Sequence, residues 1–566
     1  MQSHLFYQWY LMMSKQIHKK IFAFCLIACG IFLLWQGLLF VGYYAGAVRW
    51  KHIPLNSGSS EVPHERTMSW EDSSALTEDI LQYWAVQKLP NWQENGKVNA
   101  PRILLAKLAL KQDIEAVNTY LLNQHPWGRS GSTWALHPEG DYDFTLAALT
   151  GVLYLFGESP YVLFPETRDH LLSTLLIEEG GNPAITVPRT LGLVRDTENH
   201  LLMTEGSRYL KNRWLALHGN ADPRYNNLKN GLETWLLSFL KELREAGLYE
   251  FNSMPYLGYT MTALLNLEAF GSEAIRRSAR EILDRLNWEY AVGSFALRRY
   301  APFRRQLRKA DITSLNGDYH TALMKVWMSL LVEDPALDLE LTGGYHHALW
   351  ACLFPYRPPD KVVRWVEKKP VQYFARIGHG PGASPEIYSG SPDYLISAGG
   401  VHRGRRSMIV ARPITLMLND QAKDLKEVLH IAGPGDAFTE WNNTGVYRSF
   451  ACAAGPVHIP DSWVPAAQND LWTVYQGNEN LFIAVYSRQD LGIFCLFREE
   501  NPGKILQEVS TANPDPDRLY QEFQWPNAER ITYDVKAPKD QWVIRSADGQ
   551  KLNHDFDRWP LMEAIP

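Results

Sequence analysis

Three polar side chains, the adjacent Asn199 and His200 and the later Tyr256, have the types needed for acid–base chemistry at a carbon atom. Each belongs to a stretch with the sequence pattern of a helix that has a polar face. An amide, an imidazole and a phenol can together remove a proton from a carbon that neighbours a carboxylate. These residue types therefore predict a site for elimination next to a carboxylate group.

Elimination from a uronic acid makes two demands on such a site. The C5 proton is only weakly acidic while the neighbouring carboxylate is charged, so N–H donors must first neutralise that group. Asn199 and His200 supply an amide and a ring N–H. A base then takes the C5 proton and an acid protonates the departing O4 oxygen. Tyr256 can do one or both jobs where neighbouring donors or cations ease its ionisation.

The expected helix starts favour these roles. Asp196 or Thr197 has the residue type of an N-cap, which places Asn199 and His200 in the first turns of a helix. The partial positive charge there attracts a carboxylate and also favours the neutral imidazole. Tyr256 follows a proline, so we expect it near the start of a later inner helix. An Asn-His pair alone is more often structural than catalytic, so the prediction depends on the architecture around it.

The region 68–354 has helical periodicity, with apolar residues three and four positions apart. Clear examples are 101–110, 142–149, 228–243, 261–270, 273–290 and 321–331. Turns rich in Gly, Pro or Asn join many of these segments. A run of antiparallel helical hairpins of this length predicts an incomplete (α/α) toroid as the catalytic domain. A solenoid of helical repeats is the alternative, but the sequence has no fixed period to support it.

The pattern changes in the proline-rich segment that follows Phe354, and we expect an interdomain linker over 355–370. Short apolar segments separated by Gly, Pro, Asn and Asp come next, at 371–377, 394–398, 407–411, 414–418, 481–486 and 491–497. This pattern is typical of an antiparallel β-sandwich, which we expect over 371–566. Helices first and strands second indicate two packed domains rather than an alternating α/β fold.

The layout, the Asn199-His200 pair and a tyrosine in a later helix resemble the toroid-plus-β-sandwich polysaccharide lyases. That superfamily includes the alginate and oligoalginate lyases and the heparinase II/III-like enzymes. The resemblance covers about 68–566, and its motif is short. It implies that Asn199 and His200 engage the uronate carboxylate and that Tyr256 acts as acid or base.

These families often take a further catalytic residue from the sandwich or from a later helix. His402, in the segment Ser397-Ala-Gly-Gly-Val-His-Arg, is the first candidate in this chain. Tyr447 is the second. Without this residue the division of work between base and acid stays open.

Other residues can shape a substrate cleft. Glu205 can orient a ring or bind sugar hydroxyls, although a surface carboxylate is an equal alternative. Arg298 and Arg299 begin a basic cluster that can hold a polyanion, with a solvated loop as the alternative. Tyr319 and His320 lie where a new helix is expected to begin, so their side chains can point into the cavity.

The segment 21–48 is strongly apolar and long enough to span a bilayer of roughly 30 Å. The basic residues around it slightly favour a cytoplasmic tail at 1–20 and an exported remainder that begins with a linker at 49–67. Signal-peptide cleavage after Ala47, or lipoprotein processing at Cys29, is the alternative to a permanent anchor. We therefore expect a membrane-anchored protein whose bulk is periplasmic or extracellular, or else a cleaved and secreted form.

Net charge and composition limit the partners. The net charge is −6 and the pI about 6.3, which argues against nucleic acid. An acidic polysaccharide can still bind a local basic cleft. No cofactor or metal is expected, because the cysteines are scattered and the adjacent His346 and His347 cannot hold one ion together on a helix. Some heparinase-like sandwiches carry a structural zinc, but this sequence has no matching ligand set.

Two other functions fit the same layout. Toroid glycoside hydrolases need two carboxylic residues across the scissile bond, and Asp141, Asp143 and Glu205 could be recruited. That function would leave the Asn-His-Tyr set unexplained. A membrane-tethered protein that binds a polysaccharide without cleaving it is the other alternative.

Overall fold

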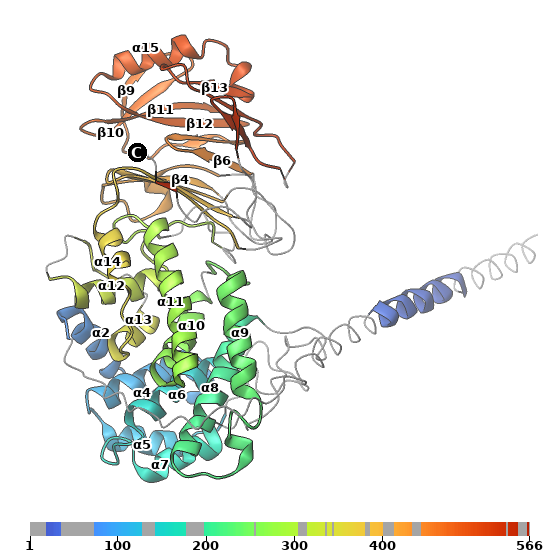
Figure 1. Cartoon of the computed structure of the whole chain (residues 1–566), viewed down its shortest axis with the longest axis vertical. Coiled ribbons are helices and arrows are strands. Elements are labelled where there is room, and N and C mark those ends of the chain that lie inside the picture. Colours follow the sequence, from blue (N-terminus) through green and yellow to red (C-terminus); the bar gives the residue numbers. More distant parts are fainter. Residues whose placement is uncertain are drawn as a thin grey trace, which may run out of the picture.

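The computed structural model has an N-terminal helical part followed by a part built from antiparallel sheets (Figure 1). It describes residues 19–35, 73–126, 142–176, 197–253, 256–303, 314–333, 337–341, 345–379, 385–399, 413–432, 443–538, 541–552 and 563–564. The sequence prediction of helices first and antiparallel strands second is therefore confirmed.

The helical part consists mainly of α-helices that follow one another along the chain. They are α2 (Ala75–Ala85), α3 (Trp92–Asn95), α4 (Asn99–Ala109), α5 (Ile114–Leu122), α6 (Asp143–Phe156), α7 (Pro165–His170), α8 (Glu198–Leu217), α9 (Leu232–Ala246), α10 (Leu257–Phe270), α11 (Glu273–Gly293), α12 (Tyr319–Leu331), α13 (Tyr345–Leu353) and α14 (Asp360–Glu367). A single π-turn, Leu171–Leu175, continues α7.

Burial separates central helices from peripheral ones. Helix α10 is buried from Leu257 to Ala269, and α6 is buried over nearly all of its length. Helix α9 instead buries one stripe of residues, as expected for a helix with solvent on its other side. Helix α8 packs against both α6 and α10, and α10 also packs against α11. This packing brings residues at the starts of α6, α8 and α10 close to one another.

The strands within the described residues form three antiparallel sheets. Their bounds are β1 (Tyr373–Ile377), β2 (Glu386–Gly390), β3 (Tyr394–Ala398), β4 (Ile414–Leu418), β5 (Leu429–Ile431), β6 (Thr444–Tyr447), β7 (Phe450–Ala453), β8 (Val457–His458), β9 (Pro465–Gln468), β10 (Thr473–Asn478), β11 (Leu481–Arg488), β12 (Leu491–Arg498), β13 (Glu522–Gln524), β14 (Arg530–Tyr533), β15 (Ile544–Ala547), β16 (Gln550–Lys551) and β17 (Glu563–Ala564). The strand orders are β17-β1-β2-β3-β4-β5-β8, β6-β7-β12-β11-β10-β9 and β13-β14-β15-β16.

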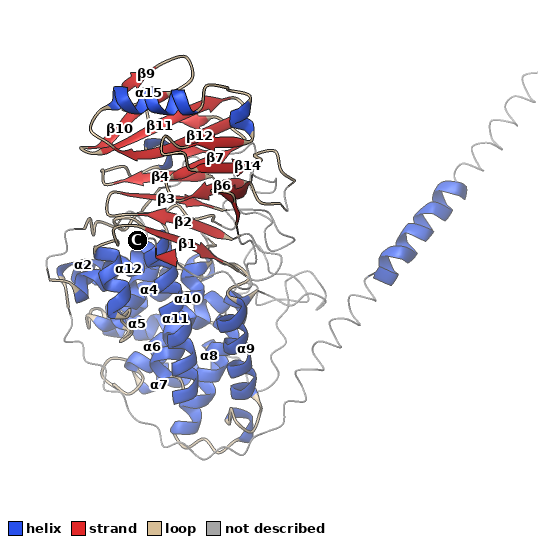
Figure 2. Ribbon diagram, turned by 45° about the horizontal axis from the view of Figure 1, so that its top comes forward, coloured by secondary structure: helices blue, strands red, loops and turns tan. Residues whose placement is uncertain are grey.

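The sheets are stacked in layers on the helical part (Figure 2). Alternate residues of β1 point to opposite sides, with Tyr373 packed toward the helical part and Phe374 toward the six-stranded sheet. Strand β11 alternates in the same way, because Ile483 faces the seven-stranded sheet while Phe482 faces the four-stranded sheet and α15 (Pro502–Ala512). The seven-stranded sheet is therefore the layer that contacts the helices.

The expected linker at 355–370 contains α14, whose Val362 and Val366 are buried against the other helices. The segment around the expected membrane span is described only at 19–35, which is helical and exposed. Among the residues with a described position, no helix is both long enough and apolar enough to cross a bilayer. The strand expected at 407–411 lies outside the described residues.

Candidate active site

The first turns of α6, α8 and α10 meet at one place in the helical part. Asp143 is the first residue of α6, His200 lies in the first turn of α8, and Tyr256 directly precedes α10. The ring centroids of His200 and Tyr256 are 6.4 Å apart. The structure thus brings together the imidazole and the phenol that the sequence singled out.

The imidazole of His200 is held by a carboxylate from the neighbouring helix. Its Nδ1 lies 2.6 Å from Oδ2 of Asp143, and the side chains are 19% and 8% exposed, respectively. The start of a helix disfavours a cationic histidine by about 0.3–1 kcal/mol. Opposite unit charges about 4 Å apart attract by about 4 kcal/mol at an effective dielectric constant of 20. The carboxylate of Asp143 therefore outweighs the helix-start effect that favours the neutral imidazole.

Asn199 is fully buried beside this pair. Its Oδ1 accepts a hydrogen bond from the hydroxyl of Thr197, the residue that precedes α8. This bond orients the amide group, and its Nδ2 has no hydrogen-bond partner within the described residues. A buried N–H group without a partner is costly and needs an explanation, such as a ligand that it binds.

Tyr256 is half-buried at the start of α10. Its backbone N–H donates to the carbonyl of Ser253 at 3.3 Å, and its carbonyl accepts from Thr260 at 3.1 Å. These bonds fix the backbone at the start of α10, and the Tyr256 ring packs against the core of the helical part beside His200. The proximity of the two rings agrees with the predicted pairing.

Aromatic rings and cations surround the candidate site. Phe144 lies edge-on to His200, with ring centroids 5.5 Å apart, and edge-on to Tyr259 at 4.3 Å. The ammonium of Lys97 lies 4.2 Å from the Phe144 ring centroid. The guanidinium of Arg102 lies 5.7 Å from the Tyr259 ring centroid and is itself buried. Phe144 and Tyr259 are themselves buried, whereas Lys97 is only partly buried, so its ammonium is the group of this cluster that can attract a carboxylate.

Tyr319, at the start of α12, extends this cluster. Its ring centroid is 6.5 Å from that of Tyr259. Burial and the neighbouring Tyr259 raise the pKa of Tyr319, and the positive charge of Arg102 only partly opposes that shift. Tyr319 is therefore a neutral phenol that can donate a hydrogen bond.

Glu205 has a different environment from the one expected for a cleft residue. Its side chain is fully buried within α8 and forms an ion pair with Arg208 at 3.1 Å. Residues three apart on a helix lie on the same face, so this pair follows the axis of α8. The carboxylate of Glu205 is thus paired with a residue of its own helix.

Arg298 connects the helical part to the seven-stranded sheet. Its Nη1 donates to Oδ1 of Asp420 at 2.6 Å and to the carbonyl of Ala422 at 3.0 Å, and its Nη2 donates to the carbonyl of Leu418. These contacts occupy the guanidinium. Arg298 therefore lies at the interface with β4 and away from the cluster around His200.

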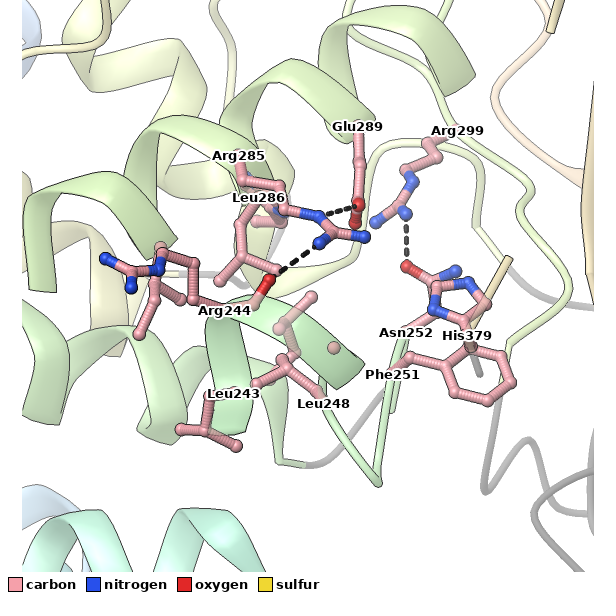
Figure 3. Close-up of a pocket in the computed structure, with 14 residues that line it drawn as sticks. Leu243, Arg244, Leu248, Phe251, Asn252, Arg285, Leu286, Glu289, Arg299 and His379 are labelled. Carbon is pink, nitrogen blue, oxygen red and sulfur yellow. Dashed lines mark hydrogen bonds and ion pairs between the residues drawn. The ribbon is translucent and has the colours of Figure 1, made fainter. Parts of the chain in front are cut away.

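Arg299 and His320 line a hollow formed mainly by residues of α9 and α11, and His379, just after β1, lines it as well (Figure 3). The hollow has an empty volume of about 500 Å³ that is partly open to solvent, and Leu248, Phe251 and Ile282 line it beside the polar groups. In it Arg285 donates to Glu289 at 2.8 Å and to the carbonyl of Arg244 at 2.9 Å. Burial, together with the charge of Arg299, holds the pKa of His320 well below its ordinary value. His320 is therefore neutral, and its Nε2 contacts Oδ1 of Asn287 at 2.9 Å.

A buried carboxylate from the first hairpin of the sheet contacts two residues that line this hollow, His379 and Asn252. Glu386 in β2 contacts Nε2 of His379 and the hydroxyl of Tyr388, and it accepts from Nδ2 of Asn252 at 2.7 Å. Asn252 in turn accepts from Arg299. The ring of His379 stacks on Phe251, a residue near Asn252, at 3.8 Å. This network joins the segment before α10 to β2.

A smaller hollow of about 190 Å³ lies next to the first. The two share Asn252, Leu257, Arg299 and His320 in their linings, and Tyr319 lines only the smaller one. Tyr319 is also the residue that touches the aromatic cluster around His200. The hollows therefore lie between the junction of the two parts and the candidate active site.

Several predicted residues are not brought to this site or lie outside the described residues. His402 and Asp141 lie outside the described part of the chain. Tyr447 ends β6 and packs against Phe374 at 5.7 Å, within the core of the sheets. The histidines at 346 and 347 belong to α13, but their side chains are not among those described.

The sequence reasoning missed the role of Asp143 beside His200. It considered Asp143 only as a carboxylate for hydrolysis, and it did not consider Lys97 or Phe144. The one available signal was the position of Asp143 at the start of a helical pattern, but no local feature joins it to His200. Only the packing of α6 against α8 creates that contact.

Among the side chains that the structure describes, no three or more His, Cys, Asp or Glu residues are placed to hold a metal ion. The candidate site thus consists of an amide, an imidazole, a phenol and a carboxylate with nearby cations. Comparison of the sequence with protein-family models and with curated proteins finds no match.

Proposed function

We propose that this protein is a lyase that cleaves a uronic-acid-containing polysaccharide by β-elimination. The observation that supports this proposal most directly is the meeting of Asn199, His200 and Tyr256 at the starts of α8 and α10. An amide donor, an imidazole and a phenol are the groups that proton removal beside a carboxylate requires.

Asn199 is the first group to act in this proposal. Its Nδ2–H, oriented by the bond between Thr197 and Oδ1, donates to the uronate carboxylate. The positive end of α8 adds to this attraction. Together with His200, the amide stabilises the enolate-like charge that builds up on the carboxylate oxygens.

Proton transfer then belongs to Tyr256, as acid, base or both. The C5–H bond breaks, a double bond forms between C4 and C5, and the C4–O4 bond breaks with its electron pair on O4. A proton is delivered to O4, so the number of protons balances without any co-reactant. The partly buried ammonium of Lys97 suits an anionic sugar ring in this position.

The alternative of glycoside hydrolysis has weaker support. It needs two carboxylic groups facing each other across the scissile bond. Asp143 is bonded to His200, and Glu205 is paired with Arg208 inside α8. Neither carboxylate is left in such an arrangement.

The proposal includes the architecture and the location expected from the sequence. The helical part would form an incomplete (α/α) toroid and the sheets a β-sandwich, as in the lyases that the sequence resembles. The apolar segment at 21–48 would anchor the chain or direct its export, which would expose the enzyme to extracellular or periplasmic polysaccharides.

The test is the ultraviolet absorbance of the unsaturated product on a panel of polysaccharides. Alginate, glucuronan, heparan, chondroitin and hyaluronan are offered to the full chain and to the variant Tyr256→Phe. We expect one substrate to yield the absorbing product, and Tyr256→Phe to reduce the rate by about 10²–10⁴-fold. Hydrolysis gives no such product.

The matched control is Tyr161→Phe, which removes a hydroxyl from an exposed tyrosine away from the site. It should retain the wild-type rate. Binding of the substrate to Tyr256→Phe is measured in parallel, because a lyase that loses its proton-transfer group still binds. Equal rates for Tyr256→Phe and wild type, or binding without any absorbing product, would refute the proposed function.

A further inference from the structure

The contact between Asp143 and His200 determines which nitrogen of the imidazole can act on a substrate. Oδ2 of Asp143 lies 2.6 Å from Nδ1 of His200. An ionised carboxylate only accepts hydrogen bonds, so Nδ1 carries a hydrogen. A neutral imidazole has a single N–H group. In neutral His200, Nε2 would therefore carry a lone pair, which repels a carboxylate.

The proposed role of His200 needs an N–H at Nε2, and only the imidazolium has hydrogens on both ring nitrogens. We infer that Asp143 is a positioning residue that holds His200 as an imidazolium. Nδ1–H then binds Asp143, and Nε2–H binds the uronate carboxylate. This inference rests on the proposed lyase function and adds to it one residue and one charge.

The surroundings of Asp143 support a cationic partner. Asp143 is buried, and its Oδ1 has no hydrogen-bond partner among the residues that the structure describes. A buried carboxylate with one polar partner is strongly stabilised when that partner is charged. His200 is the polar group in contact with it.

Three further titratable groups of the described residues belong to the elements packed around the imidazole. On α8 itself, the carboxylate of Glu198 accepts from the backbone N–H of Glu250 at 2.7 Å. Before α10 stands the phenol of Tyr256. Before α4 stands Lys97, whose ammonium contacts the same Phe144 ring as the imidazole. Asp143 is thus the carboxylate in contact with His200.

The protonation state of His200 also determines which residue removes the C5 proton. An imidazolium cannot accept the C5 proton, so among the described residues proton removal is left to Tyr256. His200 keeps its proton through the reaction and acts only as a donor to the carboxylate. The donor role makes a specific prediction: the rate falls as pH rises through the pKa of His200, because the Nε2–H is lost.

The first experiment compares pH profiles of kcat/KM for the wild type, Asp143→Asn and His200→Gln. Removal of the negative charge lowers the pKa of His200, so the alkaline fall in Asp143→Asn should move to lower pH by about one to two units. His200→Gln keeps a neutral amide N–H and should lack this fall. A rate that instead rises through the pKa of His200 would show a base and overturn the inference.

The second experiment needs no substrate. The full chain is labelled with ¹⁵N-histidine, and the ring signals of His200 are assigned by their loss in His200→Gln. We expect two protonated ring nitrogens in the wild type at neutral pH and an earlier deprotonation in Asp143→Asn. The control Asp461→Asn, at an exposed position in the sheet part, should leave the titration unchanged.

The two experiments distinguish a failure of the proposed lyase function from a failure of the inference about Asp143. A panel without any cleaved polysaccharide would refute the proposed lyase, while the ring titration would still show whether Asp143 holds an imidazolium. A neutral His200 whose titration does not respond to Asp143→Asn would overturn the inference even in an active lyase. If Asp143→Asn does not fold, the pH profile of His200→Gln still decides whether the alkaline fall depends on the imidazole.

Discussion

The buried carboxylate of Glu386 predicts a stability loss that depends on pH. Glu386 contacts His379, Tyr388 and Asn252, and Asn252 contacts Arg299, so one carboxylate joins β2 to the segment before α10. The perturbation is Glu386→Gln, which keeps the shape and one acceptor oxygen but removes the charge. We expect this variant to weaken the junction between the helical part and the sheets.

The sign of the pH effect follows from the pKa of Glu386. Burial alone would raise this pKa, but the hydrogen bond and charge of His379, the charge of Arg299 and the hydroxyl of Tyr388 together hold it below its ordinary value. The unfolded chain titrates near the ordinary value of about 4.3. The stability from ionised Glu386 is therefore fully present above that pH and is lost as the pH falls through the lower folded pKa.

The magnitude follows from what the variant leaves behind. Removal of one partner from a buried ion pair costs about 3–5 kcal/mol. Arg299 keeps Asp318 as an ionised partner at 3.4 Å, and the glutamine keeps an acceptor for Asn252. We therefore expect a loss of about 2–3 kcal/mol at neutral pH, below the full cost of a broken pair.

The assay is urea unfolding of the full chain at several pH values from neutral to below 4, with tryptophan fluorescence as the signal that monitors unfolding. The two parts of the chain can unfold separately, so each transition is fitted on its own. The wild type should lose stability on acidification more steeply than Glu386→Gln. The control Glu479→Gln changes an exposed carboxylate in the turn between β10 and β11 and should match the wild type. Equal midpoints for Glu386→Gln and wild type at neutral pH would refute the reasoning.

Three further predictions concern the junction and the candidate site. In Gly293→Ala the new methyl group would meet the buried Tyr388 ring at 2.6 Å, so thermal unfolding should show a loss of about 1–3 kcal/mol. Burial lowers the pKa of Lys369 to about 7, below its unfolded value of about 10.4, so the melting temperature of the wild type should rise between these pH values. Lys369→Met should flatten that rise, and an unchanged slope would contradict the assignment. Asn199→Ala should lower the lyase rate by about 10²–10³-fold while substrate binding, measured by calorimetry, falls much less.

Local patterns in the sequence were sufficient to predict many elements. The strands expected at 394–398 and 414–418 match β3 and β4, and the helix expected at 273–290 matches most of α11. Hydrophobic periodicity is a local property, so a short stretch is enough to detect it. Helix α14 was missed because prolines in the preceding segment suggested a linker, whereas Pro359 in fact serves as its N-cap residue.

The candidate site was only partly predictable, because local sequence patterns do not show how separate helices pack together. Asn199 and His200 are neighbours in sequence, and the N-cap position of Thr197 could be read from its residue type. The proximity of His200 to Tyr256, and above all to Asp143, depends on how α6, α8 and α10 pack. Arg298 illustrates the opposite error, because a basic cluster in the sequence does not tell whether its charges bind a ligand or a neighbouring sheet.

The charge balance of the site gives a reason why these residues occur together. The starts of α8 and α10 and the ammonium of Lys97 make the region positive, and the carboxylate of Asp143 offsets part of that charge. If His200 is an imidazolium, the pair with Asp143 is neutral. The helix starts, Lys97 and Nδ2 of Asn199, which has no hydrogen-bond partner among the described residues, then remain to attract an anion. A uronate carboxylate supplies that charge and accepts both the amide N–H and the Nε2–H. The same arrangement would bind a neutral sugar poorly, so a reduced substrate with an alcohol in place of the carboxylate should neither bind tightly nor be cleaved.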